Sequence, residues 1–180
     1  MSKWNYQKKN KNENEESLLD FFDKHIENNQ RIRRDAKIIG KRMKPLSVAE
    51  VEYIAFYLAK EFMGWDEPIP AFDSRFPNTL ESCLAMPFQR FGGKNLYKGL
   101  VEKAAFLFYL MIKNHPFRNG NKRIAMTTLF YFLHKNKKWL KVDEQELYNF
   151  AKWVAESHPK FKEETVSAIE KFIRAYMANL

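Results

Sequence analysis

Two strongly apolar segments, residues 104–112 and 124–133, flank a polar and basic stretch that reads His-Pro-Phe-Arg-Asn-Gly-Asn-Lys-Arg at positions 115–123. Apolar segments of this kind predict two buried helices. Core packing alone does not explain a histidine, several cations and a glycine turn between two buried helices. Residues that conflict with their apolar surroundings in this way are expected at a functional site. The sequence therefore predicts a fold organised around this loop.

The loop is expected to lie between the end of one helix and the start of the next. Pro116 disfavours the right-handed α conformation at His115, so the first helix should end near Asn114. The apolar pattern then resumes, which predicts a second helix starting at Asn121 or Lys122. The loop would thus end at a helix N-terminus, where backbone N–H groups and the helix dipole favour an anion.

The side chains of this stretch extend the same prediction. Gly120 allows the backbone to turn and approach a ligand closely, and successive N–H groups in such a turn can bind an anion. Lys122 and Arg123 add positive charge, and an arginine can hold a phosphate with two parallel hydrogen bonds. His115 can accept a proton near neutral pH. Together these features indicate transfer of a phosphate-containing group to a hydroxyl.

The motif His-Pro-Phe-x-x-Gly-Asn-Lys-Arg resembles the signature of the Fic/Doc family, and its Asn-Lys-Arg ending is more similar to the Doc (death-on-curing) branch. The similarity includes the residues before the motif, from Phe91-Gly92-Gly93 to Ala104-Ala105, and covers most of the chain from Leu46 onward. It implies an all-α fold, a Fic/Doc-type helical bundle with a small β-hairpin flap.

The resemblance also implies roles for individual residues. His115 would be the catalytic base that takes a proton from a target hydroxyl, and Phe117 would anchor the loop in the core. The nucleotide phosphates would be held by Gly120, Asn121, Lys122 and Arg123. The flap that aligns the target peptide would comprise Phe88, Gln89, Arg90, Phe91, Gly92 and Gly93.

Fic proteins of this kind transfer AMP from ATP to a protein side chain, and Doc-like toxins are associated with transfer of the γ-phosphate to a threonine of translation elongation factor Tu. The resemblance thus implies a nucleotide-dependent transferase that uses ATP and Mg²⁺, and it leaves phosphorylation and AMP transfer open. A Doc toxin is usually encoded with an antitoxin, so a separate antitoxin chain is an expected partner of a toxin of this type.

Asn119 departs from the family pattern, which has Asp or Glu at this position to hold Mg²⁺. An amide oxygen can bind Mg²⁺ but brings no negative charge, and Mg²⁺ prefers carboxylates. Asn119 is therefore predicted to be a weak metal ligand. Three alternatives follow: a transferase with a weaker or differently held metal, a transferase with another donor, or a catalytically degenerate member that acts by binding a protein or a nucleic acid.

The net charge of +9 is concentrated near the start of the chain. Residues 1–44 carry twelve Lys/Arg and seven Asp/Glu, and they are predicted to form a basic extension to a Fic/Doc-like domain at residues 45–180. Within the extension, residues 1–16 are expected to be disordered, and residues 17–29 and 31–42 to form helices. No nucleic-acid-binding motif is visible, so a solvated basic surface, including Lys135, Lys137, Lys138 and Lys141, is favoured over nucleic-acid binding.

Cellular location follows from similar reasoning. The single cysteine, Cys83, excludes an internal disulfide, which fits a reducing compartment. Residues 1–14 contain no apolar signal segment, and the apolar run at 104–112 is too short to span a membrane. We therefore expect a cytoplasmic protein with no membrane partner.

Capping patterns predict where the other helices begin. Ser47 and Glu50 form a capping box, and Gly64 should end that helix. Asn78 is expected to cap the next helix, and Asn95 the long helix that ends at Asn114. A hairpin is expected at residues 88–96, around the Gly-Gly pair, and Asp143 should cap a later helix.

Overall fold

The computed structural model describes residues 43–62 and 68–180, and this part of the chain is mostly helical. Predictions for residues 1–42 and the helix stop at Gly64 lie outside the described residues. The helices are α3 (Val48–Glu50), the π-helix η1 (Val51–Phe56), α4 (Tyr57–Phe62), η2 (Phe72–Ser74), α5 (Pro77–Ala85), η3 (Met86–Phe88), α6 (Leu100–Lys113), α7 (Asn121–Lys135), α8 (Glu144–Glu156), η4 (Pro159–Phe161) and α9 (Lys162–Tyr176). The strands are β1 (Arg90–Phe91), β2 (Lys94–Asn95), β3 (Lys138–Leu140) and β4 (Met177–Asn179).

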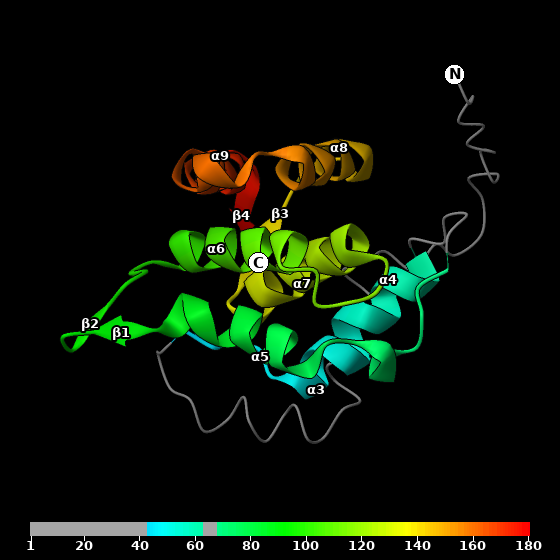
Figure 1. Ribbon diagram of the computed structural model, residues 1–180. Coiled ribbons are helices and arrows are strands. Elements are labelled where there is room, and N and C mark those ends of the chain that lie inside the picture. The colour runs from blue at the N-terminus through cyan, green and yellow to red at the C-terminus, as the bar shows by residue number, and fades with distance from the viewer. Residues whose placement is uncertain (1–42, 63–67) are drawn as a thin grey trace.

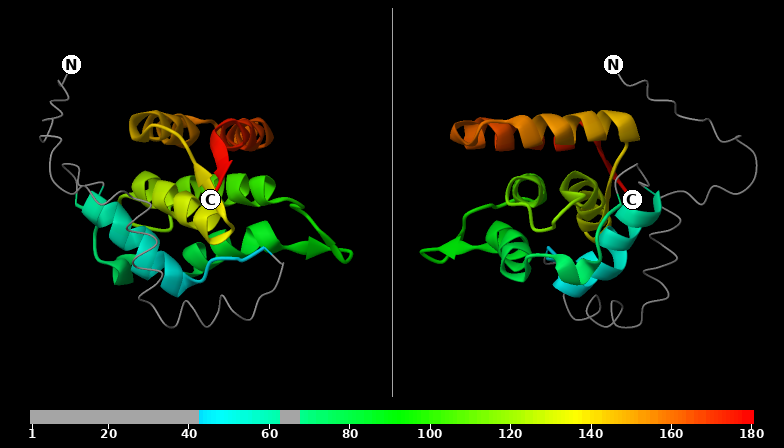
Figure 2. Two further views of the ribbon diagram at one scale, coloured as in Figure 1. Left: turned by 180° about the vertical axis from the view of Figure 1, so that it is seen from behind. Right: turned by 45° about the vertical axis from the view of Figure 1, so that its right-hand side comes forward.

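The helices lie in three layers, with α6 and α7 in the middle (Figures 1 and 2). Helices α8 and α9 cover one side of this pair, and α3, α4 and α5 cover the other. The middle layer is therefore shielded from water on both sides. This explains why the two apolar segments that flank the loop can be hydrophobic around almost their whole circumference.

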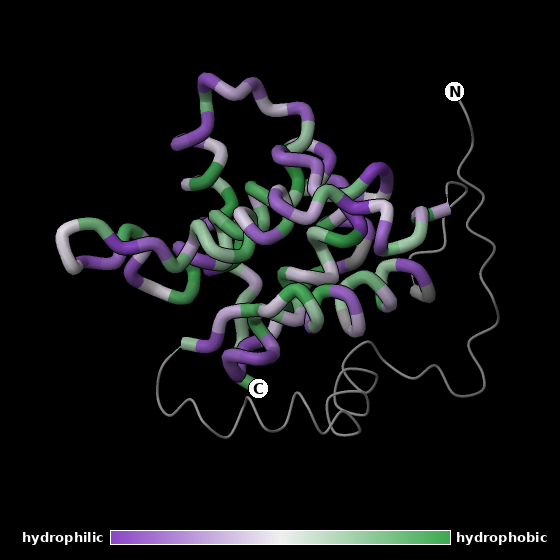
Figure 3. Tube along the Cα trace, turned by 60° about the horizontal axis from the view of Figure 1, so that its bottom comes forward, coloured by the Kyte–Doolittle hydropathy of each residue, from purple (hydrophilic) through white to green (hydrophobic). Residues whose placement is uncertain are grey.

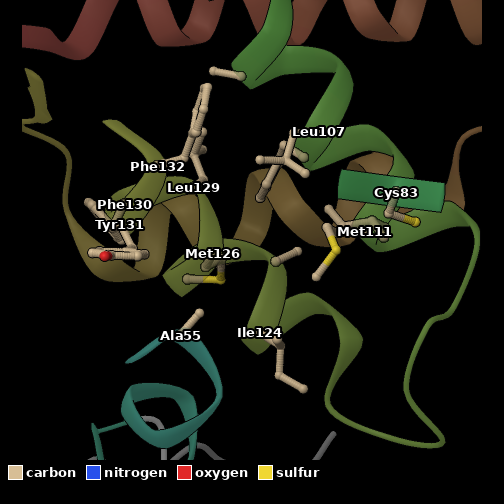
Figure 4. Packing of buried hydrophobic residues seen from close by; sticks show 14 of the residues in the cluster. Ala55, Cys83, Leu107, Met111, Ile124, Met126, Leu129, Phe130, Tyr131 and Phe132 are labelled. Atoms are coloured by element: carbon tan, nitrogen blue, oxygen red, sulfur yellow. The ribbon is translucent and has the colours of Figure 1, made fainter. Parts of the chain in front are cut away.

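The core is centred on α6 and α7. Every residue of α6 from Lys103 to Ile112 is buried, as is every residue of α7 from Arg123 to His134. Figure 4 shows Met126 of α7 next to Ala55 of η1, with Leu129 of α7 and Leu107 of α6 on the other side of Met126. The prediction that these two helices form the centre of an all-α fold is confirmed.

A buried polar cluster joins α3 to the C-terminal end of α7. Glu50 closes the predicted capping box with Ser47, and its carboxylate also accepts hydrogen bonds from Tyr131 Oη at 3.1 Å and Lys135 Nζ at 2.5 Å. The prediction that Lys135 belongs to a solvated basic surface was wrong, because this ammonium pairs with a buried carboxylate. A second contact between these layers is the hydrogen bond from Thr127 Oγ1 to the Ala55 carbonyl, at 2.7 Å.

The predicted hairpin is present as strands β1 and β2, but the helices on either side of it begin elsewhere than expected. Helix α6 starts at Leu100 rather than next to Asn95, because Asn95 pairs with Arg90 in the hairpin. Helix α5 starts at Pro77, where the fixed φ of proline favours the first helical position, and not after a cap at Asn78.

A second strand pair was not expected from the sequence. Strands β3 and β4 pair antiparallel, with Trp139 opposite Ala178, so the segment after α9 returns to the end of α7. This pairing joins residues that are far apart in the chain, and the short, basic β3 segment carries no alternating pattern that would indicate it. None of the helices in the described ranges has the length and apolar character needed to cross a membrane.

Candidate functional site

The loop between α6 and α7 begins where the first apolar helix ends. Asn114 closes α6, and its N–H donates to Leu110 O at 2.9 Å. His115 follows with φ of 48°, a left-handed conformation that histidine adopts more readily than most residues, and its side chain is exposed. The chain thus leaves the helix at His115 and presents the imidazole to solvent.

Phe117 lies in the core directly below the loop. It is 4 % exposed and packs against Phe56 of η1 and Phe72 of η2, with ring centroids 6.0 and 5.8 Å away. The preceding carbonyl, that of Pro116, accepts a hydrogen bond from the Phe76 N–H at 2.9 Å, which joins the loop to the start of α5. The loop is therefore fixed to two other parts of the fold.

Asn121 holds the loop in shape with both atoms of its amide. Its Oδ1 accepts the Phe117 N–H at 2.9 Å, and its Nδ2 donates to the Phe117 carbonyl at 2.7 Å. Asn121 was expected to hold a nucleotide phosphate, but here its side chain binds the backbone of the loop. Its backbone N–H, in the first turn of α7, is still positioned for an anion.

Gly120 provides the turn into α7. Its φ is 77°, and a Cβ built at this position would lie 2.8 Å from Cγ1 of Ile69. Gly120 has no side chain to cap the helix, and the first intrahelical bond is from Ile124 N to Gly120 O, at 2.9 Å. The N–H groups of the first turn have no acceptor within the helix, which is the arrangement that binds anions.

Three cationic side chains flank this helix end, at different depths. Arg118 is exposed, Lys122 is half-buried and Arg123 is buried. Lys113, in the last turn of α6, is used differently, since its Nζ donates to the carbonyls of Ala155 and Ser157 at the end of α8. The positive charge of the loop itself therefore comes from the residues of the motif.

The loop does not fit a carboxylate-held Mg²⁺ ion. The Oδ1 of Asn119, the one oxygen that this side chain could offer a metal, accepts the Gly120 N–H at 2.6 Å, and as an amide oxygen it carries no negative charge. Among the residues that the structure describes, no three His, Cys, Asp or Glu side chains form a metal-binding group. Mg²⁺ prefers carboxylate ligands, which this motif does not supply.

The structure does not bring the predicted flap to the loop. The hairpin precedes the first turn of α6, whereas His115 follows the last turn, and a helix of this length separates its ends by about 20 Å. Figures 1 and 3 show the hairpin standing away from the rest of the described chain. Residues 115–123 are close in space, and Phe88 to Gly93 form a separate feature.

Several supporting residues were missed by sequence reasoning. Ile69 and Phe72 lie about fifty residues before the motif and contact it only through the fold. Their segment is proline-rich and carries no periodic pattern, so no local signal linked it to the loop. Phe76, whose N–H donates to the Pro116 carbonyl of the loop, lies close to the same segment.

Comparison with known proteins supports the similarity of the motif region. Residues 45–133 match the model of the Fic/DOC family. This match spans α3 to most of α7 and contains the whole loop. No curated protein and no solved structure matches the chain significantly.

Proposed function

We propose, from the match of residues 45–133 to the Fic/DOC family, that the protein is a Fic-type transferase that moves a phosphate-containing group from ATP to a hydroxyl side chain of a target protein. The observation that carries the proposal is the arrangement of the loop. An exposed histidine at the end of α6 stands five residues before a helix N-terminus flanked by cations. This combines a proton acceptor with an anion-binding backbone.

In the proposed reaction, the His115 imidazole accepts the proton of the target hydroxyl. The hydroxyl oxygen then forms a bond to a phosphorus atom of ATP, and the bond from that phosphorus to the leaving group breaks. Attack at the γ-phosphorus releases ADP, and attack at the α-phosphorus releases pyrophosphate. The N–H groups at the start of α7, with Lys122 and Arg123, would stabilise the negative charge on the phosphates.

The Doc-like ending of the motif favours phosphate transfer as the first reaction to test, with translation elongation factor Tu as the first target. A role as the toxin of a toxin–antitoxin pair, with a separate antitoxin as partner, belongs to the same proposal.

A second candidate function is a Fic-fold protein that binds a partner and no longer catalyses. It is favoured by Asn119, which replaces a carboxylate and whose Oδ1 already accepts the Gly120 N–H. Under this alternative, the rigid loop would still bind an anion through α7 but would transfer nothing.

Label transfer tests both functions. The protein would be incubated with cell lysate and with ATP labelled at the γ- or the α-phosphate, with Mg²⁺ and with EDTA. Because His115 has a positive φ, His115→Asn is the preferred variant beside His115→Ala, since asparagine tolerates this conformation and cannot act as the base. A His115-dependent γ-label indicates a kinase, and an α-label indicates AMP transfer. No label on any protein under either condition, with the fold intact, contradicts the transferase and leaves the binding function.

A further inference from the structure

The motif supplies positive charge to the loop and no negative charge. Residues 114–123, from the C-cap of α6 to the first turn of α7, include Arg118, Lys122 and Arg123 and contain neither Asp nor Glu. The positive end of the α7 dipole lies at the same place. Within residues 114–123, the charged side chains and the helix end therefore all disfavour a bound cation.

The one side chain in the position of a metal ligand is bound to the backbone. Asn119 Oδ1 accepts the N–H of Gly120 at 2.6 Å, and this bond forms part of the turn that leads into α7. Gly120 in turn packs closely over Ile69, which leaves the turn little freedom to rearrange. The turn therefore fixes the direction of this oxygen, and the second lone pair of a neutral amide is all that Asn119 could offer a metal.

We propose that this site binds the triphosphate of ATP as the metal-free anion, with the charge compensated by Arg118, Lys122 and the N-terminus of α7 instead of by a protein-held divalent cation. The inference rests on the proposed function, because it takes ATP as the ligand of the loop. ATP without Mg²⁺ carries more negative charge than its Mg²⁺ complex, so a loop whose own charged side chains are all cationic favours the metal-free form.

Isothermal titration of ATP into the full chain tests this proposal, once with excess EDTA and once with Mg²⁺. The expected result is that metal-free ATP binds at least as tightly as the Mg²⁺ complex, and that its affinity falls as the salt concentration rises. Asn119→Asp should reverse the preference: the added charge should weaken binding of metal-free ATP by about tenfold and strengthen binding of the Mg²⁺ complex.

Asn149→Asp is the matched control, because Asn149 is exposed on α8, outside the loop. It makes the same change of net charge and should leave the preference unaltered. Binding that requires Mg²⁺ in the unaltered protein would overturn the inference, as would an Asn119→Asp variant with the same preference as the parent. Absence of ATP binding in both solutions is a different result, and it would contradict the proposed function as well.

Discussion

Asn121 and Phe117 are joined by two hydrogen bonds that together close the loop between α6 and α7: the asparagine side chain accepts from the phenylalanine N–H and donates to its carbonyl. An amide can do both at once, because it has an acceptor oxygen and a donor nitrogen on one carbon atom. The side chain of Asn121, a residue of the candidate phosphate site, therefore stabilises the loop before any ligand binds.

Replacing Asn121 should loosen the loop in two measurable steps. Asn121→Asp keeps an acceptor for the Phe117 N–H but loses the donor, and Asn121→Ala loses both. We expect the free energy of unfolding, measured by urea denaturation, to fall by about 1 kcal/mol for the first variant and about 2 kcal/mol for the second. Asn149→Ala, which removes an exposed amide on α8, should change it by less than about 0.5 kcal/mol. Equal effects at positions 121 and 149 would contradict a structural role for Asn121.

Gly120 is expected to tolerate alanine poorly for two separable reasons. Its φ of 77° disfavours any Cβ, and the added methyl would also meet Ile69. Gly93 has nearly the same φ, 78°, but nothing lies within 4 Å of its Cβ position. Gly93→Ala should therefore cost about 1 kcal/mol from backbone strain alone, and Gly120→Ala about 1 to 3 kcal/mol more from overpacking. Thermal denaturation of both variants measures the difference, and equal losses would mean that Ile69 yields without cost.

Lys103 is expected to hold the base of the hairpin against α6. Its Nζ is buried and donates to the carbonyls of Pro87 and Tyr97, at 2.8 and 2.6 Å, which lie just before and just after the hairpin. Burial lowers the pKa of Lys103, because the charged ammonium loses its hydration in the folded protein. Lys103→Met should leave two buried carbonyls unpaired and speed hydrogen exchange of the hairpin amides, with a loss of about 1 to 3 kcal/mol in stability.

The control for that exchange experiment is Lys98→Met. Lys98 is an exposed lysine beside the same hairpin, and the loss of its ammonium should not alter amide exchange. If both variants exchange at the rate of the parent protein, the hairpin is held by something other than Lys103.

Cys83 should make the protein less stable at alkaline pH. Its side chain is fully buried, and burial raises the pKa of the thiol to about 11. An unfolded thiol has a pKa of about 8.5, so between these values the folded state binds more protons and the free energy of unfolding falls as the pH rises. The loss should reach about 3 kcal/mol by pH 11. Urea denaturation at pH 8 and pH 10.5 should show that the free energy of unfolding falls less for Cys83→Ala than for the parent protein. Equal decreases in the two proteins would exclude a contribution from the Cys83 thiol.

Local signals in the sequence predicted local structure well. Ser47 with Glu50 and Asp143 both cap helices as expected, because each cap depends only on residues within one turn. The boundaries of the loop, at Asn114 and Asn121, were predicted for the same reason. In these cases proline, glycine and the short polar side chains determine the backbone directly.

The errors came from contacts between distant parts of the chain. Asn95 looks like a helix cap in isolation, but it pairs with Arg90 in the hairpin. Lys135 looks like part of a basic surface, and only the fold brings it to Glu50. The pairing of Trp139 with Ala178 likewise depends on how α8 and α9 fold back over the middle layer. At the loop between α6 and α7, the hydrogen bonds of the Asn119 and Asn121 side chains were beyond sequence reasoning because they depend on the conformation of the turn.

The three-layer arrangement implies that residues 45–133, the segment that matches the family model, would not fold stably when expressed alone. The match to the Fic/DOC family ends at residue 133, inside α7, yet one side of α6 is covered by α9, where Ile169 and Ile173 are fully buried. A fragment cut at that point would lose two residues of α7 and would expose a wide apolar surface of the central helix. Such a fragment is expected to aggregate. The segment that matches the family model is therefore shorter than the segment needed for a stable fold.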